Sequence, residues 1–259
     1  MNLNYQVFGE SGRALLLVHG LFGQIANWRS VARELSTDYR VYVVDQRNHG
    51  ESFHSGSMTY HDMATDLDQF IIEHQLDEFI LCGHSMGGKA AMVYALSDDM
   101  QSVDRMDSMI VLDIAPVQYS HSHAPYLAAL SKIDLSQIQS RAQVEKLLQP
   151  EISDDATRFF LMQSLVKKEN GFQWKLNLPV LQRYMPEIVG FPEKELVGHD
   201  SQVKTLFLYG SKSDYVTKYM YSGISEYFKN VQFDSVEAGH WLHVEQRQAI
   251  IESIKDFLK

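Results

Sequence analysis

Residues 83–88 read Gly-His-Ser-Met-Gly-Gly, and this stretch decides the fold of the chain. It directly follows the apolar run Phe-Ile-Leu-Cys at residues 79–82 and directly precedes Lys-Ala-Ala-Met-Val-Tyr-Ala-Leu, a run typical of a helix. A serine on a tight turn between a strand and a helix needs small residues two positions to either side, because the two elements approach closely there. The sequence therefore predicts a nucleophilic Ser85 at the N-terminus of a helix that stabilises a developing oxyanion.

Other short apolar runs indicate the sheet to which this turn belongs. Continuous apolar runs of about five residues are typical of strands that are buried on both faces of a parallel sheet. Amphipathic stretches such as residues 60–75 lie between the runs and predict helices. The alternation predicts a doubly wound, mostly parallel α/β sheet. The expected strands are residues 14–18, 40–44, 78–82, 108–112, 204–209 and 231–236.

The alternation stops between Pro116 and His199, where helical patterning continues without a convincing strand. We expect an α/β core at residues 1–115 and 200–259, and an all-helical cap inserted at residues 116–199. An insertion after the carboxyl end of a strand lies over the edge where open α/β sheets bind their ligands.

The composition excludes several classes of function. The chain has 23 Lys and Arg against 33 Asp and Glu, a formal charge of −10, so neither a nucleic-acid partner nor a membrane-surface role is expected. The N-terminus has no basic region followed by an apolar one, so no signal peptide is expected either. A single cysteine, Cys82, cannot form an internal disulfide, and together these features predict a cytoplasmic protein.

A second glycine-rich stretch, His-Gly-Leu-Phe-Gly at residues 19–23, follows the first long apolar strand. Acyl transfer needs two backbone N–H donors beside the nucleophile, and a loop of this kind can present one of them. We expect the N–H groups of Leu21 and Met86 to form the oxyanion hole.

The general base is expected to be a histidine late in the chain. Among eleven histidines, His240 follows the expected last strand and precedes the final helix. The pair His121 and His123 has no supporting carboxylate or cysteine cluster, so no metal site is expected.

With these three features, the sequence resembles the α/β-hydrolase superfamily over nearly its whole length. It resembles the YbfF-like esterases more closely, on residues 19–23, 45–52, 83–89 and 113–116. The resemblance implies a serine esterase without a cofactor that acts on small or medium acyl esters or thioesters. It also implies that Asp45, Arg47 and His49 form a structural loop beside the oxyanion hole.

The catalytic acid departs from the commonest superfamily pattern. That pattern places a carboxylate three residues after Gly210, where this chain has Ser213, with Asp214 one position later. The YbfF-like group also lacks a carboxylate there, and its alternative acid matches Asp113. Both candidates stay open, with Asp113 favoured.

The sequence thus predicts a carboxylesterase with the triad Ser85, His240 and Asp113, acting on a small-molecule acyl ester through an acyl-enzyme. An acyl thioesterase and a C–C bond hydrolase are the alternatives on the same triad, and a non-catalytic ligand receptor is a third. The residues expected to contact substrate are Phe22, Phe159, Phe160, Met162 and Trp241.

Overall fold

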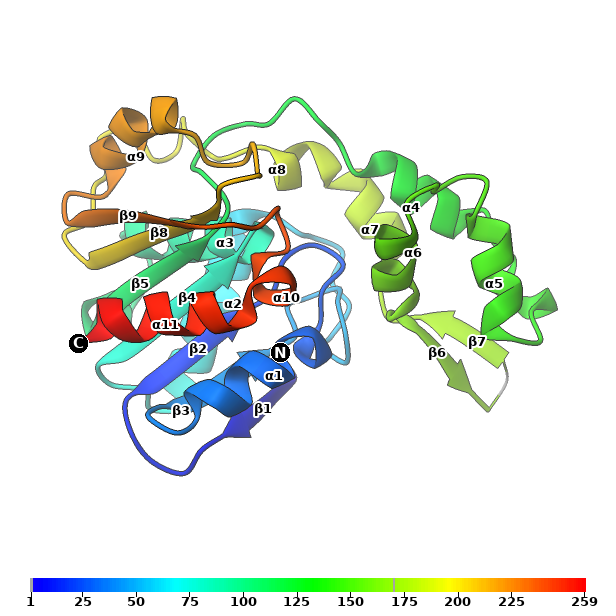
Figure 1. Ribbon diagram of the computed structural model, residues 1–259, viewed down its shortest axis with the longest axis horizontal. Helices are drawn as coiled ribbons and strands as arrows, with labels where there is room; N and C mark the ends of the chain where they lie inside the picture. Colours follow the sequence, from blue (N-terminus) through cyan, green and yellow to red (C-terminus); the bar gives the residue numbers. More distant parts are fainter. Residues whose placement is uncertain (1, 170) are drawn as a thin grey trace.

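The computed structural model describes residues 2–169 and 171–259. Within them, seven strands form one sheet in the order β1-β3-β2-β4-β5-β8-β9 (Figure 1). All neighbouring pairs are parallel except β1 with β3, which confirms the expected mostly parallel sheet. The strands are β1 Tyr5–Phe8, β2 Ala14–Val18, β3 Arg40–Val44, β4 Phe79–His84, β5 Met106–Leu112, β8 Lys204–Gly210 and β9 Val231–Val236.

Strand β1 was not expected from the sequence. It has only four residues, lies at the edge of the sheet and is half-exposed, so it lacks the continuous apolar run by which the other strands were found. Strand β4 extends two residues further than expected, to His84, and therefore reaches the serine directly.

Helices cover both faces of the sheet. Successive side chains of a strand point to opposite faces. Leu15 and Leu17 of β2 accordingly belong to one apolar cluster, with α1 and α11, while Leu16 and Val18 belong to the other, with α2 and α3. The helices of the core are α1 Ile25–Leu35, α2 Tyr60–Glu73, α3 Met86–Leu96, α9 Tyr221–Tyr227, α10 Leu242–Glu245 and α11 Arg247–Leu258, with short 3₁₀ turns at Val103–Arg105 and Lys218–Met220.

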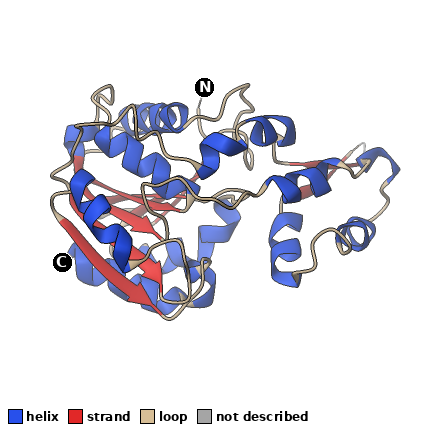
Figure 2. Ribbon diagram, turned by 90° about the horizontal axis from the view of Figure 1, so that it is seen from above, coloured by secondary structure: helices blue, strands red, loops and turns tan. Residues whose placement is uncertain are grey.

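The segment between β5 and β8 stands to one side of the sheet (Figure 2). It is mostly helical, but the expectation that it contains no strand was wrong. Strands β6 and β7 pair as an antiparallel hairpin. Each has four residues, and the exposed Lys167 and Lys168 in β6 leave no apolar run to identify it. The elements are α4 Ala124–Ser131, a 3₁₀ turn at Leu135–Gln137, α5 Arg141–Leu148, α6 Asp155–Met162, β6 Leu165–Lys168, β7 Gly171–Trp174, α7 Leu178–Arg183 and α8 Met185–Val189.

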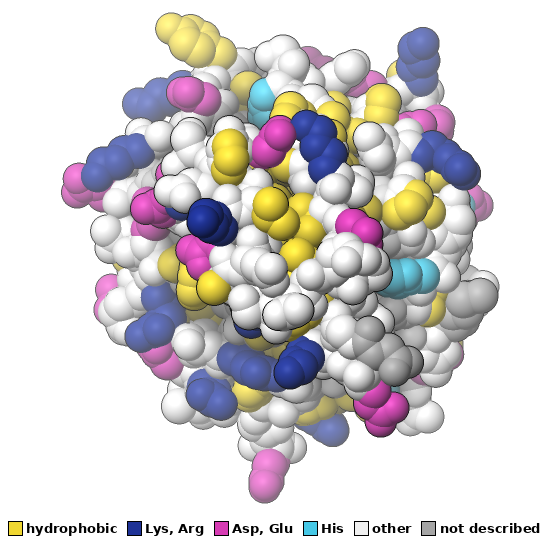
Figure 3. Space-filling model, turned by 90° about the vertical axis from the view of Figure 1, so that its right-hand side faces the viewer, with side chains coloured by type: hydrophobic (Ala, Val, Ile, Leu, Met, Phe, Trp, Pro, Cys, Tyr) yellow, Lys and Arg dark blue, Asp and Glu magenta, His cyan; other side chains and the backbone are white. Residues whose placement is uncertain are grey.

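Seen from the side of this cap, the surface carries charged side chains of both signs with hydrophobic side chains between them (Figure 3). No helix in the described part of the chain is long and apolar enough to cross a membrane.

Candidate active site

Ser85 lies at the junction of β4 and α3 in a strained backbone conformation. Its φ is 53° and its ψ is −119°, a combination that residues with a side chain rarely adopt. A Cβ on Gly83 would lie 2.2 Å from the carbonyl oxygen of Gly87, and a Cβ on Gly87 would lie 2.5 Å from that of Val18. Both glycines are therefore required by close backbone contacts, which hold the serine on a sharp turn.

The structure brings Ser85, His240 and Asp113 together from three different strand ends. The Ser85 hydroxyl donates to Nε2 of His240 at 3.0 Å, and Nδ1–H of His240 donates to Oδ2 of Asp113 at 2.7 Å. Asp113 directly follows β5, which pairs with β4, and His240 lies in the loop after β9. The parallel order of the strands places all three residues at the carboxyl edge of the sheet.

Asp113, rather than Asp214, reaches the imidazole. The Asp113 carboxylate is fully buried, and it also accepts hydrogen bonds from the Gly210 N–H at 2.9 Å and from the Ser213 hydroxyl at 2.5 Å. Asp214 is exposed, one residue beyond this contact. Ser213 occupies the position where the superfamily usually has its acid. Its hydroxyl donates a hydrogen bond to Asp113, the carboxylate that follows the neighbouring strand β5.

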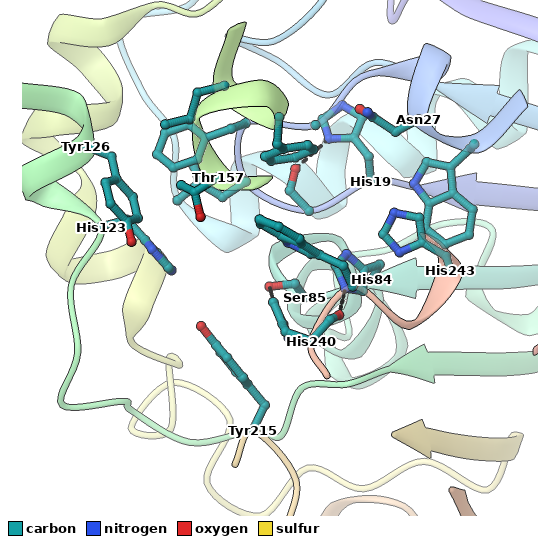
Figure 4. A pocket seen from close by; sticks show the side chains of 18 residues that line it. His19, Asn27, His84, Ser85, His123, Tyr126, Thr157, Tyr215, His240 and His243 are labelled. Atoms are coloured by element: carbon teal, nitrogen blue, oxygen red, sulfur yellow. Dashed lines mark hydrogen bonds between the residues drawn. The ribbon is translucent and has the colours of Figure 1, made fainter. Parts of the chain in front are cut away.

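Two aromatic rings lie against the ring of His240. Tyr215 stacks on it with ring centroids 3.8 Å apart and planes at 16°, and the His84 ring lies 4.9 Å away with its Nε2–H bonded to the His240 carbonyl (Figure 4). The Tyr215 hydroxyl in turn bonds Nε2 of His121 at 2.7 Å. The contacts of Tyr215 and Ser213 could not be expected from the sequence, because no spacing pattern indicates which residues these two side chains meet in space.

The loop after β2 approaches the serine closely. A Cβ on Gly20 would lie 3.1 Å from Cβ of Ser85, so the next residue, Leu21, lies beside the nucleophile. Met86 is the first residue of α3, where N–H groups have no acceptor within the helix. Leu21 and Met86 thus both lie next to Ser85.

Two buried histidines support this loop as hydrogen-bond acceptors. Nε2 of His49 accepts from the N–H of Phe22, which has a φ of 64°, and Nε2 of His19 accepts from the N–H of Gln46. Burial lowers the pKa of His49 to about 3 and also lowers the pKa of His19. Both imidazoles are therefore neutral at neutral pH, as acceptors must be.

Asp45 and Arg47 lie behind the same loop. The Asp45 carboxylate accepts from the backbone N–H groups of Ile25 and Glu51, and Arg47 forms a two-pronged ion pair with the buried Asp66. Neither side chain points at the cavity beside Ser85, which agrees with a structural part for both.

A cavity lined mainly by apolar groups opens beside Ser85, between the core and the cap. Phe22 and Trp241 line it from the core and Phe160 from α6, with the rings of Phe160 and Trp241 5.3 Å apart. The structure does not bring the other two candidate substrate-binding residues to this wall. Phe159 is 71% exposed on the outer side of α6, and Met162 is buried within the cap. Other lining residues are Leu21, Asn27, Trp28, Tyr126, Thr157, Leu161 and Tyr215 (Figure 4).

Several polar groups on this wall are uncharged at neutral pH. Burial lowers the pKa of His123 to about 4 and that of His243 to about 3, and it holds the pKa of His84 well below its usual value. Burial and the nearby Asp113 raise the pKa of Tyr215 to about 12. Among the described residues the wall contains no Asp, Glu, Lys or Arg, so the cavity favours an uncharged ligand.

Comparison with known proteins agrees with the fold. The family model described as alpha/beta hydrolase fold matches residues 13–246. The sn-1-specific diacylglycerol lipase ABHD11 of Mus musculus is 35% identical over 255 residues, which cover 95% of this chain and 80% of the relative. Esterase YbfF of Escherichia coli (strain K12) is 34% identical over 247 residues, covering 94% of this chain and 92% of the relative.

A solved structure described as a marine microorganism esterase superposes with a TM-score of 0.92 at 36% identity, covering 99% of both chains. The superposition includes both the core and the cap of this chain. The resemblance seen in the sequence is confirmed, and this chain belongs to the α/β-hydrolase family.

Proposed function

We propose that this protein is a serine carboxylesterase that cleaves small to medium, uncharged acyl esters through an acyl-enzyme. The observation that carries the proposal is the continuous chain of hydrogen bonds from Asp113 through His240 to Ser85. The names of the relatives, an esterase, a lipase and a marine esterase, support ester hydrolysis as the reaction.

The proposed reaction has two halves. Ser85 Oγ attacks the acyl carbonyl while Nε2 of His240 takes its proton, and the N–H groups of Leu21 and Met86 hold the oxyanion. His240 then returns the proton to the departing alcohol, which leaves the acyl group on Ser85. Water, deprotonated by the same imidazole, attacks the acyl carbonyl. His240 then returns this proton to Ser85 Oγ as the bond between Oγ and the acyl carbon breaks and the acid leaves. Asp113 fixes the tautomer of His240 and stabilises its cation.

The cavity supports uncharged esters over acyl-CoA thioesters. A coenzyme A ester carries several phosphate charges, and the described wall offers no cation to meet them. Neutral acylglycerols, by contrast, belong to the class of esters that this wall suits. A cytoplasmic location stays a prediction from the sequence.

A fluorophosphonate probe and a substrate panel test the proposal. We expect the probe to label Ser85 in the wild type and to leave Ser85→Ala unlabelled, whereas a non-catalytic receptor shows no label in either. In a panel of p-nitrophenyl esters and acyl-CoAs, we expect higher kcat/KM values for the esters. A preference for acyl-CoAs at equal chain length contradicts the assigned substrate class.

A further inference from the structure

Lys89 is a buried lysine that the proposed chemistry does not use. It lies one helical turn after Ser85 on α3, and it is only 1% exposed. Its Nζ donates to three backbone carbonyls, those of Val117 at 2.8 Å, Val189 at 3.0 Å and Gly190. Burial lowers the pKa of Lys89 to about 7, whereas the three carbonyl acceptors stabilise its protonated form. The three N–H donors of that ammonium group are all used, so none is left for a substrate.

The three carbonyls belong to the two chain segments that connect the cap to the core, residues 114–119 and 188–190, which we call the stalk. The two segments are bonded to each other through the Tyr119 N–H and the Val189 carbonyl at 3.0 Å. The Tyr119 ring lies 4.7 Å from the ammonium, and the Tyr60 hydroxyl donates to the Ile188 carbonyl. Lys89 is therefore the point on the nucleophile helix where both segments of the stalk meet.

The stalk carries the part of the cavity wall that belongs to the cap. His123, Tyr126 and Phe160 all lie between its two segments in the chain. Figures 1 and 2 show this part of the chain extending away from the sheet. A shift of the stalk relative to α3 moves these side chains relative to Ser85.

We propose that Lys89 is a positioning residue that clamps both segments of the stalk to the nucleophile helix and so sets the binding of the longer acyl esters. Its kinetic consequences rest on the esterase function proposed above. A short acyl group beside Ser85 touches the core loop and α3, whereas a longer one must also contact the side chains of the cap.

Loss of the ammonium has a specific structural cost. Without it, the Val117 and Gly190 carbonyls lose the lysine donor, while the Val189 carbonyl keeps the Tyr119 N–H. Buried carbonyls without a donor draw water or separate from the surface that no longer bonds them. The stalk is therefore the first part of the fold to loosen.

The test compares Lys89→Met with Lys175→Met in the full chain. Methionine keeps an unbranched, flexible side chain that is one atom shorter than lysine, and it removes all three donors. Lys175 is also a lysine that joins cap to core, through an ion pair with Glu51 at 2.8 Å, but it bonds no part of the stalk. Lys89→Gln, which retains two N–H donors, is the milder variant and carries the test if Lys89→Met does not fold.

The measurements are kcat and KM for p-nitrophenyl acetate and p-nitrophenyl octanoate, and hydrogen exchange of the stalk amides. For Lys89→Met we expect KM for the octanoate to rise about tenfold, the size of one lost charged hydrogen bond. We expect kcat/KM for the acetate to stay within about twofold. We expect the stalk amides of Lys89→Met to exchange faster than those of the wild type. The octanoate KM and the exchange rates of Lys89→Gln should lie between those of the wild type and Lys89→Met, and those of Lys175→Met should equal the wild-type values.

Three results overturn the proposal. One is an unchanged octanoate KM with unchanged stalk exchange. Another is an equal loss on both esters with faster exchange throughout the core, which marks a lysine that only stabilises the fold. The third is an equal effect of Lys175→Met. If the wild type hydrolyses neither ester, the proposed function fails instead, and the exchange of the stalk amides alone still decides whether Lys89 clamps the stalk.

Discussion

At the scale of single residues, the proposed acid is the most specific assignment. Asp113→Asn keeps the shape of the side chain but cannot fix the same imidazole tautomer, so we expect kcat to fall by about 10⁴. Asp214→Asn, at an exposed position away from His240, should stay within about twofold. Both are measured on p-nitrophenyl acetate above pH 8, where an ordinary histidine is neutral. A collapse in Asp214→Asn alone reverses the assignment, and equal losses mean a shared role.

Residues of the candidate site that lie in a local sequence pattern could be predicted, whereas contacts that form only in the folded chain could not. Ser85 and His240 could be chosen because a strand and turn motif and chain order each point to one residue. The choice between Asp113 and Asp214 stayed open because it depends on which neighbouring strand end reaches the imidazole, and the structure places Asp113 there. The contacts of Ser213 and Tyr215 could not be predicted, since they arise only when loops from different strands meet.

At the scale of elements, helix α6 of the cap provides a matched pair of variants. Phe160 lines the cavity beside Trp241, whereas its neighbour Phe159 faces outward. We expect Phe160→Ala to change the preferred acyl chain length, measured as kcat/KM over p-nitrophenyl esters of two to twelve carbons. Phe159→Ala should leave that profile unchanged. An identical profile in both variants contradicts the part assigned to Phe160.

The elements themselves were predictable where burial produces a long apolar run. The inner strands β2, β4, β5 and β8 are largely buried and were found from the sequence, with ends that differ by at most two residues from the expected ones. Strand β1 and the hairpin of β6 and β7 are short and partly exposed. Their pairing comes from tertiary contacts, which leave no such run in the sequence.

At the scale of the whole molecule, the buried histidines make stability depend on pH. Burial lowers the pKa of His49 and His243 to about 3, well below the value near 6.5 in an unfolded chain. Between these two values the unfolded state binds protons that the folded state does not. The stability is therefore complete above pH 6.5 and is lost as the pH falls from 6.5 towards 3.

Urea unfolding at pH 7.5 and pH 5.5 measures this effect. We expect the free energy of unfolding to fall over this interval by about 1 kcal/mol for each buried neutral histidine. His243 stacks on Trp28, and its Nδ1 is buried with no described partner, so His243→Phe keeps the stacking and removes the titration. The pH-dependent loss should shrink by about 1 kcal/mol in that variant. A loss of the same size in variant and wild type excludes His243 as a source.

The turnover of Ser85→Ala on p-nitrophenyl acetate tests whether Ser85 is the nucleophile of an esterase. Removal of the hydroxyl leaves the close glycine contacts of the turn in place, so we expect an unchanged melting temperature. We expect kcat to fall by a factor of about 10³ or more. A folded Ser85→Ala protein that keeps most of the wild-type turnover contradicts this assignment.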